Sequence, residues 1–159
     1  MDRNLMSKIL TQMKRHLREG KPIGDLKVGS LLALGHQLEA IFYYLGHELG
    51  SMIKAKEVEE PEKIPDTLTK IISEYNIGDV EIMSSSEDNI QLRLKNHSSI
   101  KHLINKGIKS SGSFCSFEAG LLAGIVENVI DIHCFAQETS CSLETGKDYC
   151  EFMIVFQKD

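Results

Sequence analysis

Three cysteines and one glutamate in the second half of the chain could bind a metal ion. Cys115 begins an apolar run typical of a helix, and Glu138, Cys141 and Cys150 follow around one predicted turn. Three thiolates and a carboxylate form a donor set that suits tetrahedral zinc, and a site closed by four protein ligands stabilises a fold rather than catalysing a reaction. We therefore interpret these four residues as a candidate structural zinc site.

The same cysteines have a simpler interpretation as small buried hydrophobic residues. Their pairs lack the tight spacing of a zinc knuckle, and Glu138 and Cys141, with two residues between them, come nearest to it. Cys134 shares the predicted strand face of Glu138 and is either a core residue or a replacement for Glu138 as ligand. The spacing leaves these alternatives open.

Other polar residues offer weaker indications of chemistry. Glu118 lies in the first turn of the apolar helix. A carboxylate at this position interacts with the helix dipole or with an exposed backbone amide more often than it acts as a general base. His97 and His102 follow no metal spacing and are interpreted as solvated loop residues. His133 is predicted to be exposed because it alternates with Cys134.

Motifs for cofactor chemistry are missing from the sequence. It contains no glycine-rich dinucleotide turn, phosphate loop or nucleophile elbow. We therefore do not expect an enzyme. A metal-dependent hydrolase or reductase stays open as an alternative, and a hydrolase would require Glu138 to leave zinc so that water could bind.

The charge balance argues against nucleic acid as a partner. The chain of 159 residues has 18 basic and 23 acidic residues, a net charge of -5, and no long basic run. It shows no signal-peptide pattern and no apolar stretch of membrane-spanning length, so we expect a cytoplasmic protein without membrane insertion. Four cysteines in a reducing compartment favour metal binding or burial over disulfides.

Hydrophobic periodicity predicts the elements that must position these residues. Helical spacing predicts helices over 5–17, 28–54, 115–129 and a short one capped by Asp66. Period-two alternation predicts a hairpin over 79–95 and strands over 131–137 and 149–156. The inward faces of the last two strands are predicted to carry Ile132, Cys134, Ala136 and Glu138, and Cys150, Phe152, Ile154 and Phe156.

Several motifs in the final third resemble one known family. The run Phe-Cys-Ser-Phe-Glu-Ala-Gly-Leu-Leu-Ala-Gly over 114–124, with Glu-Thr-Ser-Cys at 138–141 and Tyr-Cys-Glu-Phe at 149–152, resembles the 4-vinyl reductase domain family. The resemblance is specific over about 114–156 and looser back to about residue 29.

This resemblance implies an α+β fold, in which an antiparallel sheet of four to five strands has helices packed on one side. The fold is similar to TRAPP vesicle-tethering subunits and to haem-based nitric oxide sensors. It implies a ligand-binding domain over 28–159, preceded by an N-terminal helical extension over 1–27, and a homodimer.

The resemblance also implies a site and a function. In phenol-sensing regulators that contain this domain, three cysteines and one glutamate bind zinc beside a ligand pocket, and Cys115, Glu138, Cys141 and Cys150 match them in order. The chain is then expected to bind a small hydrophobic molecule as a sensor or carrier; the alternative is a protein-assembly scaffold. The pocket would be lined by Leu92, Leu94, Phe117, Ala119, Leu122, Cys134, Ala136 and Phe152. Since these side chains are mostly aliphatic or small, the guest should be less polar than phenol.

Overall fold

The structure is a computed structural model of the chain. It describes residues 11, 15, 16, 18–20, 23, 24, 27, 37–55, 58, 60–110 and 112–157. Most of the helix predicted over 5–17, and residues 28–36 of the second predicted helix, lie outside this described part.

The described part of the chain contains both helices and strands. In chain order they are α3 (Gln37–Ser51), η1 (Pro61–Lys63), α4 (Ile64–Glu74), β1 (Asp79–Ser85), β2 (Asn89–Lys95), η2 (Ile104–Lys106), α5 (Ser116–Ile130), β3 (Cys134–Ser140), α6 (Ser142–Thr145) and β4 (Tyr149–Phe156).

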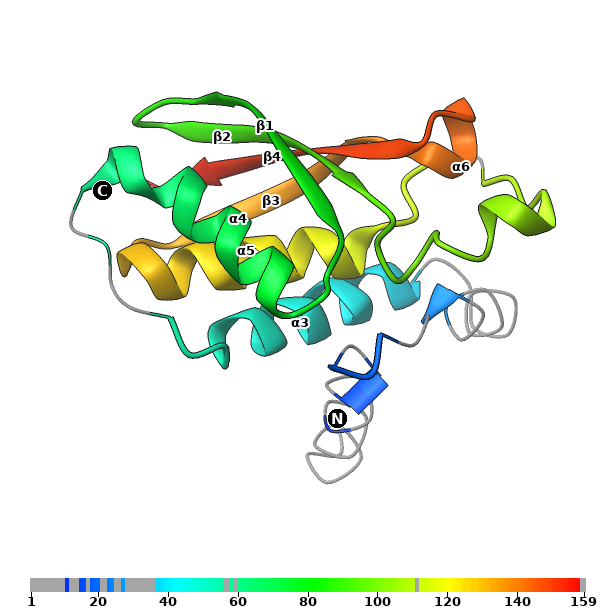
Figure 1. Ribbon diagram of the computed structural model, residues 1–159, viewed down its shortest axis with the longest axis horizontal. Helices are drawn as coiled ribbons and strands as arrows, with labels where there is room; N and C mark the ends of the chain where they lie inside the picture. Colours follow the sequence, from blue (N-terminus) through cyan, green and yellow to red (C-terminus); the bar gives the residue numbers. More distant parts are fainter. Residues whose placement is uncertain are drawn as a thin grey trace.

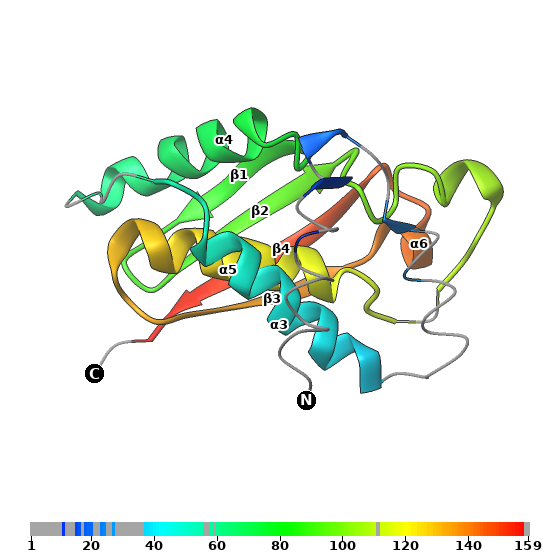
Figure 2. The ribbon, with the colours of Figure 1, turned by 90° about the horizontal axis from the view of Figure 1, so that it is seen from below.

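The strands form one four-stranded antiparallel sheet with the order β1-β2-β4-β3. The predicted hairpin of β1 and β2 is present, and β4 lies between β2 and β3. Helices α3, α4 and α5 lie on one side of the sheet (Figures 1 and 2). The predicted α+β fold is therefore confirmed.

Helix α5 is the middle layer of the molecule, between the sheet and α3 (Figure 2). This position explains why its sequence is apolar nearly all round, since both faces of the helix are buried. Glycines allow α3 and α5 to approach closely. A Cβ atom at Gly46 would lie 2.0 Å from the carbonyl oxygen of Phe117, and one at Gly120 would lie 2.0 Å from that of Tyr43.

Alternation along the strands decides which side chains enter the core. On β2, Ile90, Leu92 and Leu94 are buried. The predicted inward faces of β3 and β4 are also buried, from Cys134 to Glu138 and from Cys150 to Phe156. The hydrophobic pattern therefore set the strand register correctly over these spans.

The start of β3 corrects one prediction. Helix α5 extends to Ile130, and Asp131 caps it in a left-handed conformation with φ 52°, so the strand begins at Cys134 rather than at residue 131. Ile132 consequently lies in the connection and is 44% exposed, not inward-facing. Because the strand runs on to Ser140, Glu138 is a strand residue.

Two shorter elements also differ from the prediction. Helix α4 begins at Ile64 with Lys63 as its N-cap, which places Asp66 in the first turn instead of at the cap. The connection between β3 and β4 contains the short helix α6, which the sequence did not indicate.

Part of the segment before residue 28 packs on the rest of the fold. Ile23 and Lys27 are buried, and the backbone N–H of Ile23 donates to the carbonyl oxygen of Ser98 at 3.2 Å. Among the described helices, none is long and apolar enough to cross a membrane.

Candidate metal centre

The fold brings together the four residues that the sequence singled out. Cys115 is the N-cap of α5, Glu138 lies on β3, Cys141 precedes α6 and Cys150 is the second residue of β4. All four are buried, and one donor atom from each lies within 4.8 Å of the others. The sulfur atoms of Cys115 and Cys150 are 3.6 Å apart. Two zinc–sulfur bonds of about 2.3 Å at a tetrahedral angle place their sulfurs about 3.8 Å apart.

The carboxylate of Glu138 is held by one of its two oxygens. Oε2 accepts hydrogen bonds from the hydroxyl of Ser113 at 2.8 Å and from the backbone N–H groups of Phe114 and Cys115 at 2.7 and 2.9 Å. Oε1 is buried and has no hydrogen-bond partner within the described part of the chain. Outer donors that fix one carboxylate oxygen leave the other as a metal ligand. The residues therefore fit a Cys3Glu zinc site.

Burial and the neighbouring sulfurs shift the pKa values of this group. Burial, followed by the charge of Cys141, raises the pKa of the Glu138 carboxyl. Burial also raises the pKa of the Cys115 thiol. Hydrogen bonds from Cys115 and Cys150 lower the pKa of Cys141. The cluster thus stabilises a thiolate at Cys141, and a metal ion would replace the remaining thiol protons.

Cys134 is placed apart from this group. Its side chain is buried, and its sulfur lies 3.0 Å from the carbonyl oxygen of Ile132. Burial raises the pKa of its thiol to about 12. Glu138, and not Cys134, is therefore the β3 residue whose donor atom joins the three sulfurs.

His97 is a buried neighbour of the cluster that the sequence interpretation placed in solvent. Its side chain is fully buried, and Nε2 lies 3.4 Å from the sulfur of Cys150 and 3.8 Å from that of Cys115. Strict alternation after Leu94 would turn residue 97 outward. Strand β2 ends at Lys95 and Asn96 has φ 54°, a left-handed conformation, so the alternation of the strand does not continue to His97. The buried residues Ile100 and Leu103 that follow were the available sequence signal that this turn packs on the core.

Glu118 also differs from its predicted environment, because it is fully buried rather than near an exposed amide. One carboxylate oxygen lies 3.1 Å from Nδ1 of His97 and accepts the backbone N–H of Ser99, and the other lies 3.7 Å from Nζ of Lys27. Burial by itself raises the pKa of this carboxyl, but the charges of Lys27 and His97 lower it to about 2. Glu118 is therefore ionised and belongs to a buried ion-pair network.

The two other histidines considered in the sequence analysis, His102 and His133, lie on the surface, as predicted. His133 is 70% exposed at its side chain and lies 3.0 Å from Glu127, and His102 is exposed.

The eight residues predicted to line a ligand pocket all lie in the hydrophobic core between the sheet and the helices. Two of them, Leu92 and Phe152, also border a hollow of about 400 Å³ that includes Arg93 and Glu151. Whether the eight residues bind a ligand stays a prediction.

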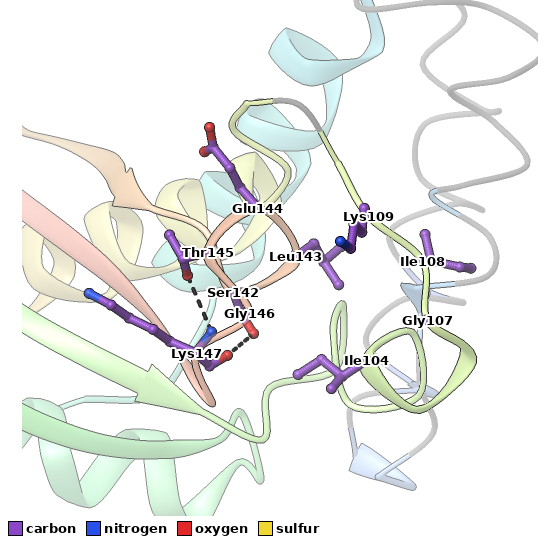
Figure 3. A pocket seen from close by; sticks show the side chains of 10 residues that line it. All are labelled: Ile104, Gly107, Ile108, Lys109, Ser142, Leu143, Glu144, Thr145, Gly146 and Lys147. Atoms are coloured by element: carbon purple, nitrogen blue, oxygen red, sulfur yellow. Dashed lines mark hydrogen bonds between the residues drawn. The ribbon is translucent and has the colours of Figure 1, made fainter.

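A second surface pocket, of about 210 Å³, is lined in part by the residues of α6, which directly follow Cys141 (Figure 3). The turn around Ile104 and Ile108 forms one wall, and α6 with Leu143 forms the other. The backbone N–H of Ser142, the first residue of α6, donates to the sulfur of Cys150 at 3.2 Å. This pocket wall is thus directly connected to the sulfur cluster.

Comparison with known proteins places the chain in a family. No family model matches it. The protein MJ0150 of Methanocaldococcus jannaschii, itself uncharacterised, is 31% identical over 129 residues, which are 81% of this chain and 70% of the relative. A vinyl-4-reductase family protein from Methanocaldococcus jannaschii has a solved structure that matches with a TM-score of 0.60 and 22% identity, over 99% of this chain and 98% of that one. The chain belongs to the same family as MJ0150, and it shares the fold of this vinyl-4-reductase family protein.

A second solved structure shares the fold. The phenol-responsive sensory domain of the transcription activator PoxR, solved with phenol, matches with a TM-score of 0.63 and 12% identity, over 84% of this chain and 72% of that one. This chain and that sensory domain therefore share a fold.

Proposed function

We propose that this protein is a member of the 4-vinyl reductase family that binds a small hydrophobic molecule as a non-catalytic sensor or carrier, and that one structural zinc ion fastens its C-terminal strands to α5. The observation that carries the zinc part is the carboxylate of Glu138. Three donors hold its Oε2, while Oε1 is buried without a partner beside three buried sulfurs. A saturated Cys3Glu site leaves no position for water and favours a structural role over a hydrolytic one.

The proposed ligand class follows from the residues expected around it. Leu92, Leu94, Phe117, Ala119 and Leu122 are among the buried side chains of the hydrophobic core. PoxR has a sensory domain of this fold and was solved with phenol, which supports a binding role for the fold. The aliphatic surroundings in this chain favour a less polar guest.

Zinc is tested by measuring metal content and stability of the purified protein together with two matched cysteine variants. Cys141→Ser removes a proposed ligand, and Cys134→Ser removes a buried cysteine outside the cluster. We expect one zinc per chain in the wild type and in Cys134→Ser, and loss of zinc with a lower melting temperature in Cys141→Ser. A zinc-free wild type, or a Cys141→Ser protein that melts unchanged, would refute the structural zinc.

Ligand binding is tested by native mass spectrometry followed by denaturing extraction. We expect a reproducible organic adduct in addition to zinc. Ala119→Leu adds bulk in the core and should lower adduct occupancy, whereas Ala40→Leu, at an exposed position of α3, should not. Zinc without any adduct would contradict the binder and favour assembly.

An assembly module is the second candidate, because apolar side chains are exposed on the sheet. Phe135 on β3 is 58% exposed, and its register partner Val155 on β4 is 38% exposed. Adjacent exposed apolar residues are typical of protein interfaces. A homodimer through this surface predicts that Phe135→Ser lowers the mass measured by light scattering, while Met52→Ser, at a residue that is 50% exposed beyond α3, leaves it unchanged.

A further inference from the structure

His97 is enclosed between the sulfur cluster and a buried ion pair. Its Nε2 lies 3.4 Å from the sulfur of Cys150 and 3.8 Å from that of Cys115. Its Nδ1 lies 3.1 Å from a carboxylate oxygen of Glu118. The imidazole is fully buried, so these neighbours, and not water, determine its orientation.

The two ring nitrogens of His97 have different contacts. Nε2 is within hydrogen-bond distance of the sulfur of Cys150, and a thiolate accepts a hydrogen bond from an imidazole N–H. Nδ1 is in ion-pair contact with Glu118 but has no hydrogen-bond partner within the described part of the chain. The contact with sulfur therefore favours a histidine whose N–H at Nε2 points toward the cluster.

Lys27 holds this arrangement from the other side of Glu118. Its ammonium is fully buried, lies 3.7 Å from the second carboxylate oxygen, and donates a hydrogen bond to the carbonyl oxygen of Phe114. The ammonium also lies 4.4 Å from the centre of the Phe114 ring. Phe114 directly precedes Cys115, and its N–H donates to Glu138. Lys27 thus braces both the carboxylate that orients His97 and the backbone that carries one sulfur.

The charges of this network suit a zinc site of the proposed composition. Zinc with three thiolates and one carboxylate has a net charge of about -2, which is costly to bury without compensation. The positive charge of Lys27 compensates the negative charge of Glu118. The network therefore adds no further negative charge beside the site.

We propose that His97 is a positioning residue for the metal centre. It donates Nε2–H to the sulfur of Cys150, with Cys115 as its second neighbour, and Glu118 and Lys27 fix its orientation. This hydrogen bond withdraws electron density from the thiolate and slows release of the metal. The inference rests on the proposed zinc site.

Two polar replacements of His97 separate its contact with Glu118 from its hydrogen bond to sulfur. Asn reaches the position of Nδ1, so His97→Asn keeps a polar group beside Glu118 and lacks the donor toward sulfur. Gln reaches the position of Nε2, so His97→Gln restores a donor toward sulfur. His102→Asn, at an exposed residue of the same connection, is the matched control.

The first readout is the rate at which the zinc-loaded full chain releases zinc to a chromogenic chelator. We expect release from His97→Asn to be roughly 10- to 100-fold faster than from the wild type, by analogy with the effect of outer-shell partners on metal affinity. His97→Gln should recover part of this loss, and His102→Asn should match the wild type. Cobalt-loaded His97→Asn should also show its sulfur-to-metal charge-transfer band at lower energy, because the sulfur has lost a donor.

A measurement on the wild type alone protects the test against a variant that fails to fold. With ¹¹³Cd in place of zinc, a hydrogen bond from Nε2–H to a metal-bound sulfur should give a through-bond coupling between that proton and the cadmium nucleus. If the wild type binds no metal, the zinc proposal fails first. If it binds one metal ion but shows no such coupling, or if His97→Asn folds and releases zinc at the wild-type rate, the role of His97 is refuted while the zinc site stands.

Discussion

Replacing Glu138 by Gln or by Ala separates the two roles of its carboxylate. In the structure, Oε2 accepts the backbone N–H groups of Phe114 and Cys115, and Oε1 is the oxygen left for a metal. Gln keeps a carbonyl oxygen that can accept the two N–H groups but replaces the anionic ligand by an amide. Ala removes both roles.

The magnitude follows from the number of donors left without a partner. Ala at position 138 would strand two buried backbone N–H groups, each of which costs about 1–3 kcal/mol, so the metal-free variant should lose about 2–6 kcal/mol. The Ser113 hydroxyl is on an exposed residue and can turn to water, so it adds little. Such a loss is a large share of the roughly 5–15 kcal/mol that stabilises a typical domain. Metal-free Glu138→Gln should stay within about 1 kcal/mol of the wild type, because both N–H groups keep an acceptor.

Urea unfolding in chelator and in excess zinc measures both effects. Zinc should stabilise the wild type by about 4 kcal/mol at a free concentration 1,000 times its dissociation constant, and it should stabilise Glu138→Gln much less. Glu144→Gln, at an exposed residue of α6, is the control and should match the wild type in both conditions. If Ala and Gln at position 138 were equally stable in chelator, the bracing of the two N–H groups would be wrong. If zinc stabilised Glu138→Gln as much as the wild type, Glu138 would not be a ligand.

Three further perturbations test the surroundings of the site. Gly46→Ala places a Cβ atom 2.0 Å from a carbonyl oxygen of α5. Chemical unfolding should show a loss of about 1–3 kcal/mol or more in folding stability. Ala40→Gly, at an exposed position of α3, should lose only about 1 kcal/mol. Tyr43→Phe removes the hydroxyl that accepts the backbone N–H of Ala136 on the edge strand β3. The variant should lose about 1 kcal/mol of folding stability and show more self-association in sedimentation. Tyr44→Phe, at a residue that is 46% exposed, should show neither effect. Burial by itself raises the pKa of Glu118, but the charges of its lysine and histidine neighbours lower it to about 2. The contribution of ionised Glu118 to folding stability is therefore complete above pH 4.5 and is lost as the pH falls toward 2. Glu118→Gln should cost roughly 3–5 kcal/mol at pH 7 in chelator and clearly less at pH 3, and a cost independent of pH would contradict the ion pair.

The sequence by itself determined the local parts of this protein. Period-two alternation fixed the inward faces of β2 and β4, because each strand buries one face of a sheet and exposes the other. The nearly uninterrupted apolar run over 115–129 predicted a helix buried on several sides, which the position of α5 between the sheet and α3 explains. The order of Cys115, Glu138, Cys141 and Cys150 indicated a candidate donor set, since the type of a side chain restricts which metals it suits, and the fold brings these four residues together.

Only the tertiary structure decided what surrounds those donors. Asn96, directly after β2, has a left-handed conformation, so the alternation that predicts exposure ends before His97, and His97 is buried. Glu118 forms an ion pair with Lys27, which lies 91 residues earlier in the chain. No periodicity of the sequence relates two residues so far apart. Burial of a charge depends on whether the folded chain supplies an opposite charge at that point. Local patterns record which residues prefer to be buried, but only packing determines which of them meet.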